Sequence, residues 1–276
     1  MIALITGASS GIGEEFAKIL AKKGFNLILV ARRKGRLSDL RRELMSNYNI
    51  KVRALTADLS DEEECIRLYE TVKKLKIDIL INNAGFGLFG KFTETNLHRE
   101  LEMIDLNIKA VHILTKLFVR DFAQRNYGFI LNVSSIAGFM AGPLMATYYA
   151  SKNYVTQLTR AIGKELKKDK KNVYVGVLCP GPVKTEFNKV AGSEFAVSGI
   201  TAAEAAQYAV SEMFKGNTVI IPSNSAKTLA AMSKFAPSKL MLTAAYFAQT
   251  ARRGDPSDSK PLLLNSDNNS EKKTDE

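Results

Sequence analysis

Short apolar runs and amphipathic stretches alternate along the first 222 residues of the chain. The runs are too short for helices and rich in Ile, Leu and Val, which is typical of strands buried in a sheet. They lie at residues 2–5, 25–30, 51–57, 77–81, 128–133, 173–178 and 218–221. Between them, apolar residues recur at helical spacing. This alternation predicts an α/β fold, a Rossmann-type doubly wound seven-stranded parallel sheet flanked by helices on both faces.

A glycine-rich loop joins the first of these strands to the first helix. It spans residues 6–13 and contains Gly7, Gly11 and Gly13. In such a loop, backbone N–H groups and the positive end of the helix dipole face an anion, usually a pyrophosphate. Gly7 and Gly11 allow tight turning and close approach, and Gly13 lets the helix lie close to the sheet. An ordinary glycine-rich turn is the alternative, which the loop alone does not exclude.

Two arginines follow the second strand, where a dinucleotide fold places the adenine ribose. The strand ends in Ala31, and Arg32 and Arg33 come next. An acidic residue there would accept hydrogen bonds from a free 2′-hydroxyl, whereas guanidinium groups suit a 2′-phosphate. The sequence therefore favours NADP over NAD. Alternatively, the two arginines only begin the basic helix that follows.

Polar residues also follow the third and fourth strands. Asp58 could reach the adenine ring from the end of its strand, or it could start a turn. Asn82 and Asn83 leave an apolar strand, where amides are costly to bury unless they are hydrogen-bonded. We expect these amides to tie adjacent strands together and to line the cofactor.

One long helical pattern, from Leu97 to about Arg125, carries a polar residue on its apolar face, Asn107. The simplest interpretation is an amide capped by its neighbours. The functional alternative is a local break in the helix that binds water near the reaction.

Tyr148 and Lys152 are four residues apart in the next helical segment, so they share one face of it. A tyrosine hydroxyl has an ordinary pKa of about 10, and a neighbouring ammonium group favours the phenolate and lowers that pKa. Ser135, just after the fifth strand, could hydrogen-bond the same substrate oxygen. This arrangement suits polarising a carbonyl and supplying a proton while a nicotinamide delivers hydride. A tyrosine and a lysine at this spacing occur often by chance. Here the pair is informative because it follows Ser135 and the glycine loop in the chain.

The composition is that of a globular protein, with 46% hydrophobic and 24% charged residues in 276. The two cysteines, Cys65 and Cys179, and the two histidines have no metal-ligand spacing, so we expect no metal and a reduced, cytoplasmic protein. We expect no spanning helix and no signal peptide, because the apolar runs are short and begin at Ile2. The net charge of +11 is most simply a basic solvated surface. Because no nucleic-acid motif accompanies it, we expect no nucleic-acid partner.

These residues together resemble the short-chain dehydrogenase/reductase family. The matching motifs occur in family order over residues 1–222, and they are Thr6-Gly7-x-x-x-Gly11-x-Gly13, Asp58, Asn82-Asn83-Ala84-Gly85, Asn107, Ser135, Tyr148-x-x-x-Lys152 and Pro180-Gly181-Pro182-Val183-x-Thr185. The resemblance implies the strand order 3-2-1-4-5-6-7. It also implies an NADP(H)-dependent oxidoreductase that reduces a ketone or aldehyde to an alcohol, or catalyses the reverse. The apolar residues of 86–92, 139–145 and 187–198 favour a lipophilic small-molecule substrate.

The resemblance assigns roles to individual residues. Tyr148, and not Tyr149, is the proton donor, since only Tyr148 has a lysine four residues on, and Ser135 holds the substrate oxygen. Lys152 binds the nicotinamide ribose and lowers the Tyr148 pKa, and Asn107 anchors a water relay. The predicted cofactor-binding residues are Gly7, Ser9, Ser10, Gly11, Ile12, Gly13, Arg32, Arg33, Asp58, Leu59, Asn83, Ala84, Gly85, Tyr148, Lys152, Pro180, Gly181, Val183 and Thr185.

About fifty residues follow the last predicted strand, where many family members end. We expect a catalytic domain at 1–222, a helical extension at 223–254 and a disordered tail at 255–276, which is rich in Asp, Asn, Ser and Lys. Within the extension, residues 238–253 have apolar side chains between basic ends. This segment fits an amphipathic membrane-surface helix, a lid or a subunit contact, and packing on the protein's own domain is the default.

A second hypothesis is a non-catalytic protein that senses NADP(H) or acts as a scaffold. Asn107, Ser135, Tyr148 and Lys152 favour the enzyme, because a pure binder would not need all four. We also expect a homo-oligomer in the cytoplasm, with any membrane contact peripheral and made through residues 238–253.

Overall fold

A central sheet of seven parallel strands organises the computed structural model, which describes residues 1–192 and 199–250. The strands are β1 (Ile2–Thr6), β2 (Asn26–Ala31), β3 (Val52–Thr56), β4 (Ile79–Asn82), β5 (Gly128–Val133), β6 (Val173–Leu178) and β9 (Val219–Ile220). Their order in the sheet is β3-β2-β1-β4-β5-β6-β9. The predicted fold class and strand order are confirmed.

Strand β1 lies between β2 and β4, so the order of the strands reverses there. The register places Leu4 opposite Ile28 on one side and opposite Leu80 on the other. In open parallel sheets, ligands bind beyond the carboxyl ends of the strands at such a switch point. The segments that follow Thr6 and Asn82 therefore face one crevice.

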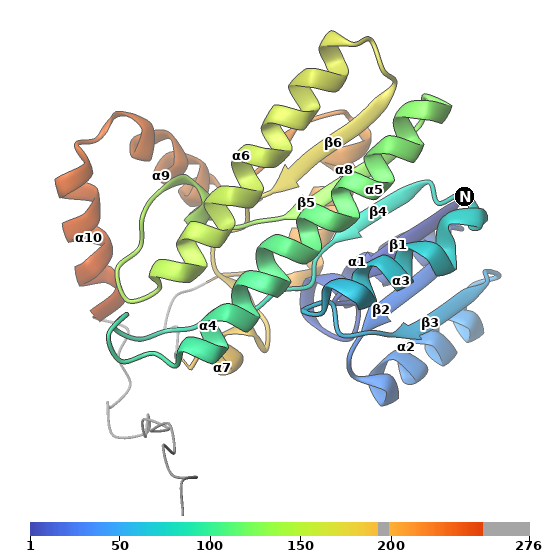
Figure 1. Cartoon of the computed structure of the whole chain (residues 1–276), viewed down its shortest axis with the longest axis horizontal. Coiled ribbons are helices and arrows are strands. Elements are labelled where there is room, and N and C mark those ends of the chain that lie inside the picture. The colour runs from blue at the N-terminus through green and yellow to red at the C-terminus, as the bar shows by residue number, and fades with distance from the viewer. Residues whose placement is uncertain (193–198, 251–276) are drawn as a thin grey trace, which may run out of the picture.

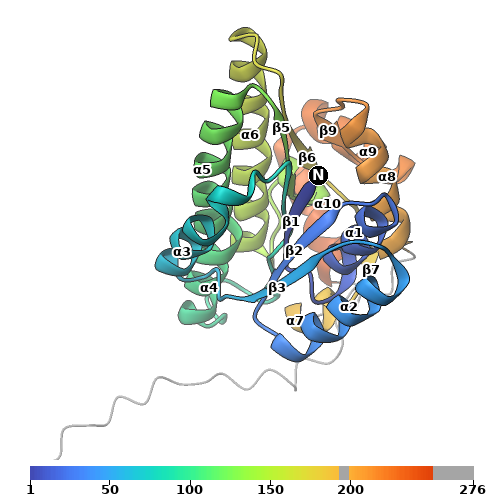
Figure 2. The same cartoon turned by 90° about the vertical axis from the view of Figure 1, so that its right-hand side faces the viewer.

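Helices cover both faces of the sheet (Figures 1 and 2). One layer is α3 (Glu62–Val72), α5 (Ala110–Arg125) and α6 (Ala146–Lys168), and the other is α1 (Gly11–Lys22), α2 (Lys34–Asn47) and α8 (Ala202–Phe214). Each layer buries its own apolar cluster, around Phe118 and Phe122 in the first and around Phe16 and Leu20 in the second. Two short 3-10 turns link this first layer to the sheet, η1 (Lys73–Leu75) between α3 and β4 and η3 (Ile136–Phe139) between β5 and α6.

The long helical pattern around Asn107 is divided in the structure. Helix α4 (Leu97–Ile104) leads into a π-helical turn, η2 (Asp105–Lys109), and α5 follows. Asn107 lies in the middle of η2 and is fully buried. The local break that the sequence suggests is therefore present, and π turns are often found at functional sites.

Residues after β6 contain short elements that the sequence did not predict. A second, two-stranded parallel sheet joins β7 (Val183–Lys184) to β8 (Ile200–Thr201), and α7 (Phe187–Ala191) lies between them in the chain. From residue 179 to about Gly199 the sequence indicates no helix or strand. Residues 193–198 of that stretch lie outside the described residues.

Two further helices follow β9, namely α9 (Asn224–Phe235) and α10 (Ser238–Thr250). Helix α9 packs against η3, while α10 lies at the outer edge of the molecule (Figure 1). The tail predicted to be disordered lies outside the described residues. Among helices within 1–192 and 199–250, none has both the length and the apolar character needed to cross a membrane.

Candidate active site

The glycine loop makes the tight turn that the sequence predicts between β1 and α1. Gly7 and Gly11 have φ angles of +64° and +58°, a region that favours glycine. A Cβ on Gly13 would lie 2.3 Å from the carbonyl oxygen of Gly7, so no other residue fits there without displacing backbone. The amino end of α1 is thereby held at the carboxyl end of β1.

A cleft of about 430 Å³ runs along this end of the sheet. Except for Gly13, which packs beneath the loop, every predicted cofactor-binding residue lines it, and so does Ser135. Phe86, Met145 and Phe187, from the predicted substrate region, line it as well. The cleft therefore joins the dinucleotide loop and the proposed catalytic residues in one cavity.

Tyr148 and Lys152 come from the same face of α6 and are both buried, with 8% and 5% of their surface exposed. Lys152 Nζ donates to the carbonyl oxygen of Val133 at 3.1 Å and lies 5.8 Å from the centre of the Tyr148 ring. Ser135 follows β5 and hydrogen-bonds to Tyr148. Its hydroxyl also accepts from the N–H of Ala137 at 3.2 Å.

Burial dominates the acid–base properties of this pair. It raises the pKa of Tyr148 above its ordinary value, and the hydrogen bond with Ser135 acts in the opposite direction. Burial also lowers the pKa of Lys152 to about 8. The protein's own groups thus keep Tyr148 protonated at neutral pH, against the lowering that the sequence predicts from Lys152.

Asn107 does not line the cleft but braces its wall. Its Nδ2 donates to the carbonyl oxygen of Phe86 at 2.9 Å, and its Oδ1 accepts from the N–H of Phe86 at 3.1 Å. Nδ2 also contacts Ser151 Oγ at 3.2 Å. A side chain on Gly85 would come within 2.8 Å of Asn107 Oδ1. The contacts fix the Gly85–Phe86 backbone beside Lys152, and the water relay stays a prediction.

The two asparagines at the end of β4, Asn82 within the strand and Asn83 just after it, tie strands together, as predicted. Asn82 Nδ2 donates to Asn132 Oδ1 on β5 at 2.8 Å. Asn83 Nδ2 donates to the carbonyl oxygens of Thr6 and Gly7 at 3.0 and 3.2 Å. Because these bonds consume the Asn83 amide, its backbone and the residues after it form the cleft wall.

Arg33 lies against the glycine loop. Its guanidinium donates to Ser10 Oγ at 2.6 Å and to Ser9 Oγ at 3.1 Å, and its Nη1 pairs with Glu186 at 2.9 Å. Arg32 instead contacts Asp58 at 3.4 Å and Glu102 at 3.1 Å.

Asp58 is held as a carboxylate beside Arg32. Burial alone would raise its pKa, but hydrogen bonds from Ser60 and the charge of Arg32 lower it overall. Asp58 therefore starts the turn after β3 and also lines the cleft.

The cleft residues that were not predicted from the sequence include Tyr149, Glu186 and Gln249. Gln249 comes from α10, is 2% exposed and donates from Nε2 to Tyr149 Oη at 3.0 Å. Its Oε1 is buried and has no hydrogen-bond partner among the described residues. A lone glutamine in an apolar helix carries no sequence signal for such a position.

Within the part of the chain that the structure describes, no group of three or more His, Cys, Asp or Glu side chains could hold a metal ion. The glycine cradle, the amino end of α1 and the arginines fit a dinucleotide. The site and fold thus define a nicotinamide-dependent oxidoreductase architecture.

Comparison with known proteins identifies the family. The model of the short chain dehydrogenase family matches residues 1–196, so the chain belongs to this family. Its residues are 34% identical over 193 positions to a very-long-chain 3-oxoacyl-CoA reductase of Mycosarcoma maydis, covering 68% of this chain and 55% of that protein. An uncharacterized oxidoreductase of Staphylococcus saprophyticus is also 34% identical, over 68% of this chain and 80% of that protein. The chain spans about half the length of most curated relatives it matches first.

Solved structures resemble the protein over nearly its whole length. A short-chain dehydrogenase from Sphingobium yanoikuyae in complex with NADPH has a TM-score of 0.79 and 29% identity, covering 96% of this chain and 98% of that chain. A bulky-bulky ketone specific alcohol dehydrogenase from Comamonas testosteroni has a TM-score of 0.73 and 28% identity, and the match covers 95% of this chain and 98% of that chain.

Proposed function

We propose that the protein is an NADP(H)-dependent reductase that converts a lipophilic ketone or aldehyde to an alcohol. The observation that carries the proposal is the placement of Ser135, Tyr148 and Lys152 in the same cleft as the glycine loop. A protein that only binds the cofactor would not need these three groups together.

The residues that would hold the cofactor follow from the shape of the cleft. The loop glycines and the first turn of α1 would take the pyrophosphate, and Arg33 and Arg32 would take the adenosine 2′-phosphate. Lys152 would take the nicotinamide ribose, with Thr185 near the carboxamide. When bound, NADPH supplies a hydride to the carbonyl carbon.

The protein's own groups would handle the proton. Ser135 Oγ and Tyr148 Oη would both hydrogen-bond the substrate oxygen, which polarises the carbonyl. Tyr148 would give its proton to that oxygen as the alcohol forms, and the Lys152 ammonium would stabilise the phenolate left behind. Because burial keeps Tyr148 protonated at neutral pH, the site is set for reduction under those conditions.

The lining of the cleft supports an apolar substrate. Phe187 lies 5.4 Å from Tyr148 between ring centres, and Phe86, Met145 and Val190 also line the cavity. Gln249 and Tyr149 add one polar position to this wall. The names of two similar proteins, a very-long-chain 3-oxoacyl-CoA reductase and a bulky-bulky ketone specific alcohol dehydrogenase, support a ketone that carries a long or bulky substituent.

A reductase assay tests the proposal. NADPH oxidation would be followed with long-chain 3-ketoesters, bulky aryl ketones, aliphatic aldehydes and sugar carbonyls. We expect turnover with the apolar carbonyls, little with sugars, and a preference for NADPH over NADH. Tight NADPH binding without turnover of any compound would overturn the proposal in favour of a sensor or scaffold.

A further inference from the structure

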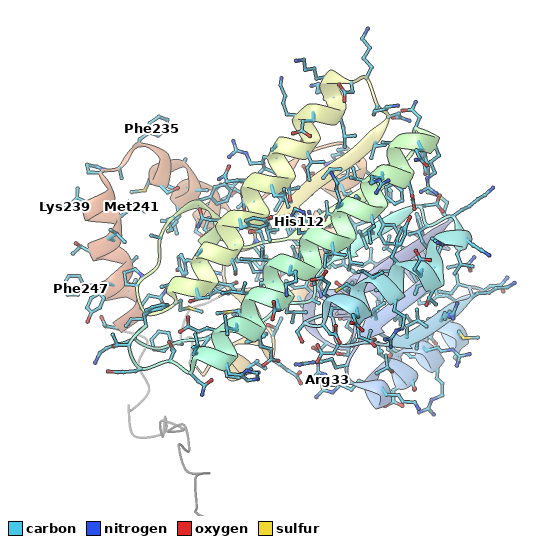
Figure 3. The ribbon with its side chains drawn as sticks, in the orientation of Figure 1. Arg33, His112, Phe235, Lys239, Met241 and Phe247 are labelled. Atoms are coloured by element: carbon cyan, nitrogen blue, oxygen red, sulfur yellow. The ribbon has the colours of Figure 1, made fainter. Side chains whose placement is uncertain are left out.

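The two C-terminal helices present an unusual number of large apolar side chains to solvent. Phe235 is 87% exposed, Phe247 67% and Leu240 65%, and Met232, Leu242 and Tyr246 are exposed as well. Figure 3 shows Phe235 at the turn between α9 and α10, and Lys239 and Phe247 on the outward side of α10. We call Phe235, Lys239, Leu240 and Phe247, with Met232 and Tyr246, the outer α9–α10 surface.

Helix α10 has two distinct sides. Met241, Ala245 and Gln249 recur every four residues on its inward side, where exposure is lowest. Leu240 and Phe247 lie seven residues apart on the opposite side. The outward side is therefore apolar without being part of the core, because α10 already packs inward through another set of residues.

The charged residues of the segment that forms these two helices have one sign. Residues 223–250 include three lysines and no Asp or Glu. Lys239 is exposed beside Leu240, and the whole chain has a net charge of +11. Apolar side chains that are flanked by lysines and free of acidic residues match an anionic lipid surface, where the apolar groups enter the interface and the lysines meet headgroups.

We propose that the outer α9–α10 surface docks on the surface of an anionic lipid bilayer. A second copy of the chain fits less well, because it would bring like-charged lysines together without acidic partners. Docking would also bring one wall of the cleft near the lipid, since Gln249 lines the cleft from the opposite side of α10. This proposal does not depend on the proposed reductase activity.

Co-sedimentation of the full chain with vesicles tests the docking. The vesicles would be phosphatidylcholine alone, or phosphatidylcholine with about one-third phosphatidylglycerol. We expect binding to the anionic vesicles and much weaker binding to the neutral ones. The triple variant Phe235→Ser, Leu240→Ser, Phe247→Ser should bind anionic vesicles at least about tenfold more weakly. Lys239→Glu should weaken binding to anionic vesicles by about tenfold and should not change binding to neutral vesicles.

The matched control is Met45→Ser with Ile66→Ser, which removes exposed apolar side chains from α2 and α3 and should bind as the native protein does. Unchanged NADPH affinity and melting temperature would show that each variant is folded. The proposal is overturned if the native protein ignores anionic vesicles or if the triple variant binds them equally well. It is also overturned if the native protein is a dimer without lipid and the triple variant is a monomer, because a second copy would then be the occupant.

Discussion

Arg33 and Glu186, which are 153 positions apart, form an ion pair beside the glycine loop at one end of the cleft. Glu186 also pairs with Arg36 at 2.8 Å, and hydrogen bonds from these two arginines lower its pKa. A carboxylate therefore occupies part of the guanidinium surface that would take a 2′-phosphate. It would compete with that phosphate and repel it.

Glu186→Gln should therefore strengthen NADPH binding by about two- to fivefold, since exposed ion pairs are worth about 0–1 kcal/mol. NADH affinity should not change, because NADH has no 2′-phosphate. Fluorescence titration of both cofactors measures this, with Glu94→Gln, which removes an exposed carboxylate paired with Lys91, as the control. Weaker binding of both cofactors would show instead that the ion pair closes the cleft over them.

Arg33→Asp should weaken NADPH binding at least about tenfold, because each charge-assisted hydrogen bond contributes about 1.5–3 kcal/mol. Arg32→Asp should also weaken NADPH binding, but by a smaller factor, since Arg32 contacts Asp58 and Glu102 and not the glycine loop. Both substitutions should reduce the difference in affinity between NADPH and NADH. The control is Arg42→Asp on α2, because Arg42 pairs with Asp39 and does not line the cleft. Unchanged NADPH affinity in both cleft variants would contradict the NADP assignment.

Tyr148→Phe should reduce turnover by about 10²–10⁴-fold, the usual contribution of a general acid. NADPH affinity should stay within about twofold, because the hydroxyl acts on the substrate oxygen. Tyr149→Phe should retain turnover and change KM, since it removes the acceptor of the Gln249 hydrogen bond. Single-turnover and steady-state rates would separate the two effects. If Tyr149→Phe is inactive and Tyr148→Phe turns over normally, the catalytic assignment is wrong.

Gln249→Ala should raise KM in the same way as Tyr149→Phe, and the double variant should add little to either. Two residues that share one hydrogen bond show such non-additivity. Fully additive KM changes would mean that Gln249 and Tyr149 meet the substrate separately.

Lys152→Met should stabilise the cofactor-free protein near neutral pH while abolishing most activity. The folded-state pKa of Lys152 is about 8, below its ordinary 10.5. Between these values the unfolded chain binds the proton and the folded chain does not. Burial of Lys152 therefore costs stability below pH 8, and the cost fades as the pH rises toward 10.5.

The expected gain at pH 7 is roughly 1–3 kcal/mol, less than the full shift because the bond to Val133 is lost. Urea unfolding of both proteins at pH 7 and pH 10 checks it, and the gain should be much smaller at the higher pH. If the difference in unfolding free energy between the two proteins is the same at both pH values, the buried Lys152 ammonium does not destabilise the native protein.

Local patterns predicted the strands of the sheet, and the family resemblance supplied their order and most of the cleft residues. Each strand is a short apolar run, and the loop glycines, Ser135 and the Tyr148–Lys152 pair act within a few residues of where their pattern appears. The carboxyl ends of parallel strands then meet at one edge, so the residues assemble there without further information.

Glu186 and Gln249 could not be predicted in this way. Glu186 meets Arg33 only because β7 and α7 fold the chain back over the cleft, and β7 is two residues long. Gln249 reaches Tyr149 across 100 positions, through the angle between α9 and α10. Such contacts depend on tertiary geometry, which no local spacing encodes. The π turn at Asn107 was foreseen only as a break, since a helix pattern does not reveal one extra residue in a turn.

That extra residue sets the evolutionary freedom of the segment. The π turn holds one more residue than an α-helical turn would, so deleting one residue from 105–109 would let α4 and α5 join as one regular helix and would remove the turn in which Asn107 is buried. Asn107 would then leave Phe86, and the cleft wall would lose its brace. The number of residues in this segment therefore matters to the cleft wall as much as the identity of Asn107 does.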